Sequence, residues 1–507
     1  MAMREHYKIK TTMSEPAPFL VDDADVPALS EAVFAIGRAG YCEAAVQERL
    51  GLTDLTSLNW RNLPVYRDER LAERDTLALA IDLFLLQGSL DKDELDRLLA
   101  VSGREVFLRT GLLEIDEMGR ARARASLFPV GGRLIFSDHA WPELPHPGRV
   151  EVPYDQVMAV GLDSRHLAHA TIRRPVRLAL DLCTGSGIHA LLAARHAERV
   201  CAVDINPRAV RCTRFNAHAL GIANLEAAEG DLFEPVRGER FDLITANPPF
   251  VPSPANTLLF RDGGPSGEDV QKRIVAGLPH HLAPGGAAQL VTELGEREGE
   301  PIASRLREWL AGAPMDIYVL RVASHTASQY AIGHAKGDDF GSFLDSTRGR
   351  LDNLRAQGYA RVVSVLISFQ WSSPASGGEP WERVDESRPP RRAAGSEIEA
   401  AFLAERLARE PDLRGRLEGS WLRRADPIAR FDATVLGSAI PPKATATRLG
   451  QALSIEYELD PVERQILARM EGRVAAEEFE ISEVSVLEAI RSLLRKRLAS
   501  IEREQAS

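Results

Sequence analysis

The stretch LALDLCTGSG (178–187) is followed along the chain by CAVDINP (201–207), GDLFEP (230–235) and ITANPPF (244–250). The first of these reads as an apolar strand that breaks into a glycine-rich turn, and the second reads as a strand that ends in an acid. A further acid stands in the GDLFEP loop, and the last strand ends in Asn-Pro-Pro-Phe. In this order the four stretches predict a site that holds a nucleoside-bearing cofactor beside a planar nitrogen group.

Strands and helices alternate around these motifs, which predicts an α/β fold. The expected strands are VRLALDL (176–182), RVCAVD (199–204), one within 224–231, FDLITA (241–246), AAQLVTE (287–293), MDIYVLRV (315–322) and RVVSVLISF (361–369). Near-continuous apolar strands separated by helices are typical of a parallel sheet that is covered on both faces. Ligands of such sheets bind at the carboxyl ends of the strands, which is where each motif falls. We therefore expect a Rossmann-like sheet of seven strands.

The chain has 507 residues, which is too long for one ordinary domain. Helical stripes before the α/β region end in a hairpin around Gly131-Gly132, which predicts a mainly helical, winged-helix-like N-terminal domain. A stretch rich in Pro, Ser, Gly and charge separates the α/β region from further helical patterns. The expected organisation is a tail (1–15), the N-terminal domain (16–150), the α/β domain (151–371), a linker (372–396) and a helical C-terminal domain (397–507).

The formal net charge of −11 argues against a general nucleic-acid binder. Four arginines near the expected hairpin could contact phosphates, or they could line a solvated strand face: Arg120, Arg122, Arg124 and Arg133. The cations near the end of the last predicted helix (484–501) could likewise be a docking face or a solvated helix end. No apolar run is as long as a membrane span, and the first residues lack a signal-peptide core. We expect a cytoplasmic protein without a metal site.

The glycine-rich turn TGSG (184–187) directly follows the first strand of the α/β region. Glycines let a ligand approach the backbone closely, and they let the next helix begin with its N–H groups directed at an anionic group. Asp204 ends the next strand, where a carboxylate can accept hydrogen bonds from both hydroxyls of a ribose. Asp231 stands where a loop acid can accept a bond from an adenine amino group. Each feature has an alternative. The glycines could form a plain tight turn, Asp204 could cap the helix that begins at Asn206-Pro207, and Asp231 could be a turn residue.

The motif NPPF (247–250) suits the binding of a planar NH₂ group. The side-chain oxygen of Asn247 and the carbonyl of Pro248 can accept its two hydrogens, because the prolines stiffen the segment and turn that carbonyl into the site. Phe250 can stack on the flat group and exclude water. With the group aligned for in-line attack, no strong base is required. A structural Asn-Pro turn after a strand is the alternative.

The motifs DLCTGSG, AVDINP, EGDLF and NPPF in this order resemble those of a class I S-adenosylmethionine-dependent methyltransferase of the Asn-Pro-Pro-Phe/Tyr type. Such enzymes include the glutamine methyltransferases of release factors and the N6-adenine methyltransferases. The stretch FRDGGPSGEDVQKRIVAGLPHHLAPGG (260–286) is more similar to the glutamine enzymes. The chain also resembles large bacterial methyltransferases with a winged-helix-like N-terminal domain, whose Ala-Thr-x-Arg lead-in is similar to Ala170, Thr171 and Arg173.

The resemblance implies S-adenosylmethionine as cofactor and assigns two sets of site residues. The catalytic set is Asn247, Pro248, Pro249 and Phe250. The cofactor-binding set is Thr171, Arg173, Asp181, Cys183, Thr184, Gly185, Gly187, Asp204, Ile205, Asp231, Leu232 and Asn247. Cys183 departs from the pattern, because glycine often holds its position.

Three functions remain open at the level of the sequence. The first is N-methylation of an amide or amine in a protein, peptide or small metabolite, which the acidic composition and the Asp-Gly-Gly segment favour. The second is methylation of a base in RNA or DNA, and the third is a methyltransferase-like scaffold that binds a partner. Arg261 and Asp262 could gate the acceptor pocket or form a turn with the glycines that follow. Four more residues could line a pocket or be structural: Tyr154, His189, His325 and His334.

Overall fold

A computed structural model of the chain describes residues 19–139, 153–253, 258–337, 339–372, 379–425, 428–432, 444–449, 452–470 and 473–503. The predicted tail (1–15) lies outside the described residues. The chain divides into two compact units. We call Met1–Gly161, Thr184–Ala194 and Asp204–Glu229 the first unit, and Leu162–Cys183, Arg195–Val203 and Gly230–Ser507 the second unit. None of the helices within the described ranges is long and apolar enough to cross a lipid bilayer.

The helices of the first unit confirm the sequence patterns. Helix α1 (Val26–Arg38) buries the predicted stripe of Leu29, Ala32, Val33 and Ile36. Helix α5 (Lys92–Leu98) begins with a capping box, in which Asp91 accepts from the Glu94 backbone and Glu94 accepts from the Asp91 backbone. The remaining elements are η1 (Asp23–Asp25), α2 (Glu43–Leu50), η2 (Leu55–Ser57), η3 (Trp60–Asn62), α3 (Leu63–Val65), η4 (Tyr66–Arg70), α4 (Thr76–Ala80), η5 (Ile81–Leu85), α6 (Val101–Arg109), α8 (Ile188–Ala193) and α9 (Pro207–Ala219).

The expected hairpin around Gly131-Gly132 is present as β4 (Ser126–Val130) and β5 (Arg133–Ser137), which pair antiparallel. A three-stranded sheet precedes it, with the order β1 (Ser89–Leu90), β3 (Ala121–Ala123) and β2 (Leu113–Ile115). Three arginines of this region form ion pairs or hydrogen bonds within the first unit. Arg122 pairs with Asp116 at 3.1 Å, Arg124 pairs with Glu114 at 3.6 Å, and Arg120 donates to the carbonyl of Ser89. These contacts tie the strands together, so they do not support a phosphate-binding role for these three side chains.

The central sheet has eight strands in the order β13-β11-β12-β10-β9-β6-β7-β8. Their bounds are β6 (Val176–Leu182), β7 (Ala197–Asp204), β8 (Leu225–Glu229), β9 (Phe241–Ala246), β10 (Leu282–Glu296), β11 (Met315–Thr326), β12 (Arg361–Trp371) and β13 (Glu382–Glu386). The fold class is confirmed, since the seven predicted strands are all present. The prediction of an entirely parallel sheet was wrong in one respect, because β12 runs antiparallel to both β10 and β11. A strand buried on both faces has the same apolar composition in either direction.

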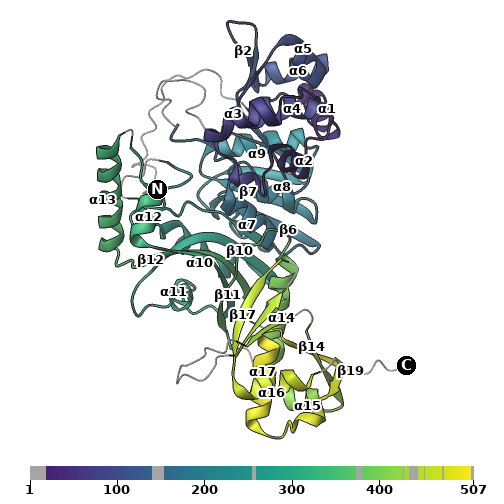
Figure 1. Cartoon of the computed structure of the whole chain (residues 1–507), viewed down its shortest axis with the longest axis vertical. Coiled ribbons are helices and arrows are strands. Elements are labelled where there is room, and N and C mark those ends of the chain that lie inside the picture. Colours follow the sequence, from purple (N-terminus) through teal and green to yellow (C-terminus); the bar gives the residue numbers. More distant parts are fainter. Residues whose placement is uncertain are drawn as a thin grey trace. The chain divides into compact units, whose positions relative to one another are not determined.

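Helices cover both faces of the part of the sheet that belongs to the second unit. On β10, Leu290 lies in one core cluster with Ile274 of α10 (Asp269–His281), whereas the next residue, Val291, lies in another with Leu167 of α7 (Leu162–Ala170). This alternation follows from the two-residue period of a strand. The other helices here are α11 (Ile302–Trp309), α12 (Ala327–His334) and α13 (Phe340–Ala356), of which α12 and α13 pack against each other (Figure 1).

The stretch expected as a linker (372–396) contains part of the central sheet. Strand β13 pairs in parallel with β11, and Trp381 is buried with its ring 5.1 Å from that of Phe402. Phe402 belongs to α14 (Gly395–Ala408), which shares a core cluster with α7 and β10. The linker prediction is therefore wrong for Trp381–Glu386, because the polar composition of this strand hides a single buried tryptophan. Residues 373–378 lie outside the described residues.

Strands accompany the expected helices of the C-terminal segment. They form the sheets β18-β14-β19 and β15-β16-β17, with bounds β14 (Ser420–Arg424), β15 (Ile428–Asp432), β16 (Ala444–Leu449), β17 (Ser454–Leu459), β18 (Arg473–Ala475) and β19 (Ala499–Arg503). The helical elements are α15 (Leu413–Leu417), α16 (Pro461–Arg469), η8 (Ala476–Phe479) and α17 (Val484–Arg495). The last helix was expected to reach residue 501. It ends at Arg495, because Arg497 takes a left-handed backbone conformation and β19 then begins.

The cations at the end of α17 are not a docking face. Arg491 donates to the carbonyl of Ala408, and Lys496 lies 2.7 Å from the buried carboxylate of Glu463. Arg495 pairs with the equally buried Glu405 at 3.2 Å. These contacts join helices of the same segment, so both earlier alternatives, docking and solvation, are replaced by internal pairing.

We predict that Trp381→Ala lowers the free energy of unfolding by about 3–5 kcal/mol, because it empties a large buried site. The matched control is Val384→Ala on β13, the strand that directly follows Trp381, where the residue is 44% exposed and the effect should stay within about 0.5 kcal/mol. Urea denaturation followed by far-UV circular dichroism measures both. Equal stability of the two variants would mean that this segment is a linker after all.

Candidate cofactor and acceptor site

Asp204, the last residue of β7, holds the glycine-rich turn of the first unit. One of its carboxylate oxygens accepts from the Gly185 N–H at 2.9 Å, and the other accepts from the Asn206 N–H at 2.9 Å. Burial raises the pKa of Asp204, against the backbone N–H groups of Asn206, Gly185 and Ile205, which lower it. A carboxylate offers about four lone-pair positions, so further acceptor capacity remains for hydroxyl groups.

Asp204 is not the cap of the following helix. The side chain of Asn206 caps α9 instead, by accepting from the Arg208 N–H at 2.9 Å. The alternative role that the sequence left open for Asp204 is thus taken by its neighbour. The hydrogen-bond pattern favours a carboxylate placed for a ligand beside the turn.

The two glycines of the turn have different tasks. Both have positive φ, +57° at Gly185 and +86° at Gly187. A Cβ atom at Gly185 would meet nothing within 4 Å, whereas one at Gly187 would lie 2.9 Å from the Thr213 side chain. Gly185 therefore borders open space that a ligand can enter, and Gly187 is required by packing. Cys183 has a φ of +55°, which explains why glycine often holds that position in similar enzymes.

Ile205 and Thr184 complete the first-unit part of the site. The Ile205 side chain is 43% exposed directly after β7, although it is apolar. An exposed branched side chain directly after Asp204 is open to contact with a flat ligand group. Thr184 is buried and belongs to the framework of the turn.

In the second unit, three of the predicted cofactor residues are engaged in packing or in pairs. Asp181 is buried in β6 and accepts from the Thr245 hydroxyl at 2.8 Å. Asp231 pairs with Arg273 at 2.7 Å. The Leu232 side chain is buried in the core around β9, and its φ of +52° directs the backbone of this loop. Asp231 and the Leu232 backbone can still meet a ligand, but Asp181 acts as a support.

The lead-in residues Thr171 and Arg173 close the end of α7. The Thr171 hydroxyl donates to the Leu167 carbonyl at 2.7 Å, and Arg173 donates to the Ala168 carbonyl at 2.5 Å. Both side chains thereby donate to carbonyls of the last turn of α7, of which that of Leu167 also accepts from the Thr171 N–H at 2.9 Å. The expected contact with the methionine carboxylate requires Arg173 to leave the Ala168 carbonyl.

Asn247 is held in one orientation by Ser164, a residue that sequence reasoning missed. The Asn247 amide nitrogen donates to the buried Ser164 hydroxyl of α7 at 3.0 Å. With the amide nitrogen on Ser164, the side-chain oxygen of Asn247 is left for an acceptor N–H. Pro248 is buried, and Pro249 and Phe250 are half-buried. The signal for Ser164 was weak, because a serine in a helix carries no pattern of its own.

The segment after the motif folds back on it. The Val251 N–H donates to the Arg261 carbonyl at 2.9 Å, and the Gly263 N–H donates to the Val251 carbonyl at 3.0 Å. The carboxylate of Asp262 is buried and accepts from the Leu258 N–H at 3.1 Å. Asp262 therefore shapes a turn, as the alternative reading held, and its contacts do not support a role in gating.

Sequence reasoning also missed Glu293, near the end of β10. The Tyr330 hydroxyl donates to its carboxylate at 2.5 Å, and the Ser364 hydroxyl donates at 3.1 Å. Burial raises the pKa of Glu293 to about 7. The sequence did contain a signal for Glu293, because it is an acid at the end of the predicted strand AAQLVTE. The same pattern, an acid at a strand end, identified Asp204.

Two of the histidines considered from the sequence have structural surroundings in the described chain. His334 stacks on Tyr330 at 4.0 Å, and its ring lies 3.0 Å from the Tyr330 carbonyl. Burial lowers the pKa of His334 to about 4, so it is neutral near pH 7. His189 is buried in α8, and His325 is exposed.

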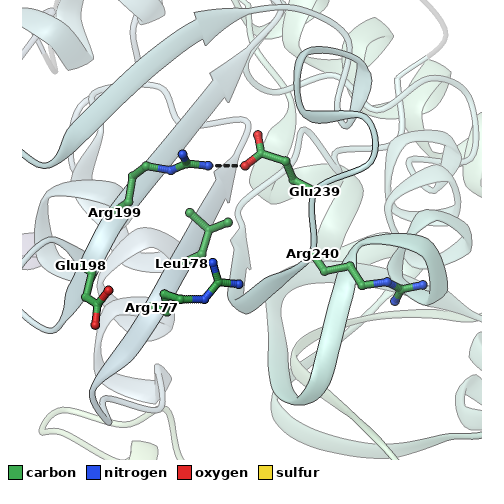
Figure 2. A pocket seen from close by; sticks show the side chains of 6 residues that line it. All are labelled: Arg177, Leu178, Glu198, Arg199, Glu239 and Arg240. Carbon is green, nitrogen blue, oxygen red and sulfur yellow. Dashed lines mark hydrogen bonds and ion pairs between the residues drawn. The ribbon is translucent and has the colours of Figure 1, made fainter.

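A surface cavity of about 530 Å³ lies at the amino ends of strands of the central sheet (Figure 2). Its lining residues are Arg177, Leu178, Glu198, Arg199, Glu239 and Arg240. They stand at or just before the amino ends of β6, β7 and β9, and Arg199 pairs with Glu239 across the opening. The motifs follow the carboxyl ends of the same strands, so this cavity is not the predicted site.

Residues 162–308 match the family model described as "Methyltransferase small domain". Over this segment the chain is similar to that family. The matched segment contains the β6-to-β9 motifs and the segment that folds back on Asn247. The expected class I methyltransferase domain, with S-adenosylmethionine as its cofactor, is confirmed for this segment.

Named relatives align with about a quarter of the chain. A ribosomal protein uL3 glutamine methyltransferase of Bradyrhizobium diazoefficiens is 40% identical over 133 residues, covering 24% of this chain and 41% of the relative. A release factor glutamine methyltransferase of Moorella thermoacetica is 35% identical over 140 residues, covering 25% of this chain and 49% of the relative. The chain thus spans about half of the length of the curated relatives that it matches. A solved ribosomal protein L11 methylase from Lactobacillus delbrueckii subsp. bulgaricus is 17% identical, with a TM-score of 0.24 and coverage of 41% of this chain and 77% of that one.

We predict opposite consequences for the two glycines of the turn. Gly187→Ala should lower the free energy of unfolding by about 1–3 kcal/mol, because it adds a backbone strain and a clash with Thr213. Gly185→Ala should cost only about 1 kcal/mol but should weaken the binding of S-adenosylhomocysteine at least tenfold. Chemical denaturation and calorimetric titration measure the two effects. Undiminished binding by Gly185→Ala would show that the turn does not border the cofactor.

Proposed function

We propose that the chain is an S-adenosylmethionine-dependent N-methyltransferase that acts on a planar amide or amine nitrogen of a protein. The observation that carries this proposal is the orientation of Asn247 by Ser164, which leaves an amide oxygen for an acceptor N–H. Asn247 follows β9, which is the neighbour of β6 in the sheet, and the glycine-rich turn follows β6. The glycine-rich turn and Asn247 thus each follow the carboxyl end of a strand of the same sheet.

The residues divide between the cofactor and the acceptor. Asp204 would accept the ribose hydroxyls, Ile205 would contact the adenine, and the open side of Gly185 would admit the cofactor. The Asn247 side-chain oxygen and the Pro248 carbonyl would accept the two N–H hydrogens of the acceptor, which fixes its plane and raises the electron density on nitrogen. Bound there, S-adenosylmethionine supplies an electrophilic methyl group.

A protein glutamine is the acceptor that the comparisons favour. The relatives are named for glutamine in ribosomal protein uL3 and in release factors. The segment that folds back on Asn247 contains the Asp-Gly-Gly stretch that resembled those enzymes. A side-chain amide presents the planar NH₂ that the motif suits, so we rank it above a free peptide or small metabolite. We expect the reaction in the cytoplasm.

A nucleic-acid base is the weaker proposal. Its support from the sequence was the shared Asn-Pro-Pro-Phe motif and the arginines near the hairpin. Arg122 and Arg124 are paired with acids, and the chain carries a net charge of −11. A scaffold role is weaker still, because Asp204 and Asn247 are both placed for ligands.

We predict that Asn247→Ala reduces methyl transfer at least a hundredfold, because it removes an acceptor-positioning oxygen. Its affinity for S-adenosylhomocysteine should stay within about twofold of wild type. Asp204→Asn should show the reverse order, with cofactor affinity reduced about tenfold or more, because a charge-assisted hydrogen bond to the ribose is lost. Calorimetric titration and the transfer of labelled methyl groups to ribosomal proteins and release factors measure the two properties.

The variants act as controls for each other. A wild-type protein that fails to bind S-adenosylhomocysteine would exclude the enzyme. Binding without labelling of any protein, combined with labelling of RNA or DNA, would favour the nucleic-acid alternative. Wild-type rates for Asn247→Ala would show that the motif is a structural turn.

A further inference from the structure

We propose that Glu293 faces the methyl-transfer site and takes the proton that the acceptor nitrogen releases. The inference rests on the proposed function and adds a residue to it. The NPPF motif does not include this carboxylate. Its support comes from the sheet, from the first turn of α7 and from the groups that surround it.

The sheet register places Glu293 beyond the end of the neighbouring strand. Strand β9 ends at Ala246, which is paired with Leu290, while β10 continues to Glu296 and pairs there with β12. The chain leaves β9 at Asn247, so the side of β10 that follows Leu290 adjoins the start of the NPPF segment. Glu293 is three residues past that last pair.

Side chains alternate between the two faces of β10, and this alternation gives the direction of the Glu293 side chain. Gln289 accepts from the Ile172 N–H and donates to the Ala170 carbonyl at the end of α7, and Val291 packs with Leu167 of the same helix. Residues two apart on a strand share a face. Glu293 therefore points to the face that α7 covers.

The first turn of α7 brings Glu293 and Asn247 together. Ser164 accepts from the Asn247 amide, and the adjacent residue, Asp163, is close enough that its charge raises the pKa of Glu293. Adjacent Cα atoms are only about 3.8 Å apart. The amide that holds the acceptor and the carboxylate of Glu293 thus flank the same turn.

The groups around Glu293 suit a proton acceptor near neutral pH. Burial raises its pKa most and the charge of Asp163 adds to this, whereas the hydroxyls of Tyr330 and Ser364 and the charge of Arg261 lower it. His334 and Arg350 stand next to Tyr330. At a pKa of about 7 the group is half ionised at neutral pH and is a stronger base than an ordinary carboxylate.

The reaction releases a proton that such a group can take. The acceptor nitrogen attacks the methyl carbon, the N–C bond forms, and the C–S bond breaks with its electron pair passing to sulfur. The nitrogen then carries one proton too many. Asn247 and Pro248 offer only amide oxygens, which are poor bases. The carboxylate of Glu293 accepts the proton, becomes a neutral carboxylic acid and releases it to water after the product leaves.

A cofactor analogue tests the placement of Glu293 without knowledge of the acceptor. Sinefungin carries a CH–NH₃⁺ group where S-adenosylmethionine carries its sulfonium methyl, and an alkylammonium keeps its charge below about pH 9. The ratio of sinefungin affinity to S-adenosylhomocysteine affinity, measured by calorimetry, should rise about tenfold between pH 6 and pH 8 as Glu293 ionises. Glu293→Gln should remove this rise and leave S-adenosylhomocysteine binding unchanged.

Two further substitutions shift the midpoint in opposite directions. Tyr330→Phe removes a donor to the charged carboxylate, so the midpoint should move to higher pH. Asp163→Asn removes a repelling charge, so the midpoint should move to lower pH. Because these are shifts rather than losses, partial destabilisation of a variant does not imitate them.

The outcomes separate this inference from the proposed function. Failure of the wild type to bind S-adenosylhomocysteine would defeat the proposed function. Normal binding with a ratio that is independent of pH, or that Glu293→Gln leaves unaltered, would overturn the role of Glu293 alone. With a protein acceptor in hand, Glu293→Gln should lower kcat at least tenfold and abolish the acidic limb of the pH profile, and retention of that limb would also overturn it.

Discussion

The parallel pairing of β9 with β10 is the constraint on which the acceptor side of this protein depends. The two strands are in register from Leu243 to Ala246, and β9 then stops while β10 runs on against β12. The end of one strand frees the backbone of the NPPF segment to turn, and the continuation of the other supplies a rigid wall beside it. Both strands are buried on both faces, so a slip of one residue would move every side chain to the opposite face and to different packing partners.

Helix α7 links this pair of strands to the side-chain amide of Asn247. Its first turn holds Asn247 through Ser164, and its last turn is tied to Gln289 of β10. The C-terminal segment supports the same helix, because Ala394 donates to the His169 carbonyl and the core of α14 includes Leu167. A segment far away in the sequence thus supports the helix that bonds Asn247, a residue of the proposed acceptor site. This explains why the buried Trp381 and the strand β13 belong to the fold rather than to a linker.

Charge is used inside the molecule more than on its surface. Arginines that looked available to phosphates near the hairpin pair with Asp116 and Glu114, and the cations of α17 satisfy Glu405 and Glu463. A buried carboxylate requires a partner, because its desolvation is costly. Glu293 differs, since its partners are hydroxyls and a distant arginine and its pKa stays near 7. That difference is what marks it as a candidate for proton transfer.

The sequence by itself determined the α/β class, the seven core strands and the order of the motifs, because apolar periodicity, glycines and acids at strand ends are local signals. It also led to Asp204 and Asn247, whose positions follow directly from the strand before each of them. Tertiary structure alone decided the antiparallel direction of β12, the place of β13, and the roles of Ser164 and Glu293. Those depend on partners far along the chain, such as Asn247 for Ser164 and Tyr330 for Glu293. Burial and pairing of this kind arise only when separate segments pack, so no local pattern encodes them.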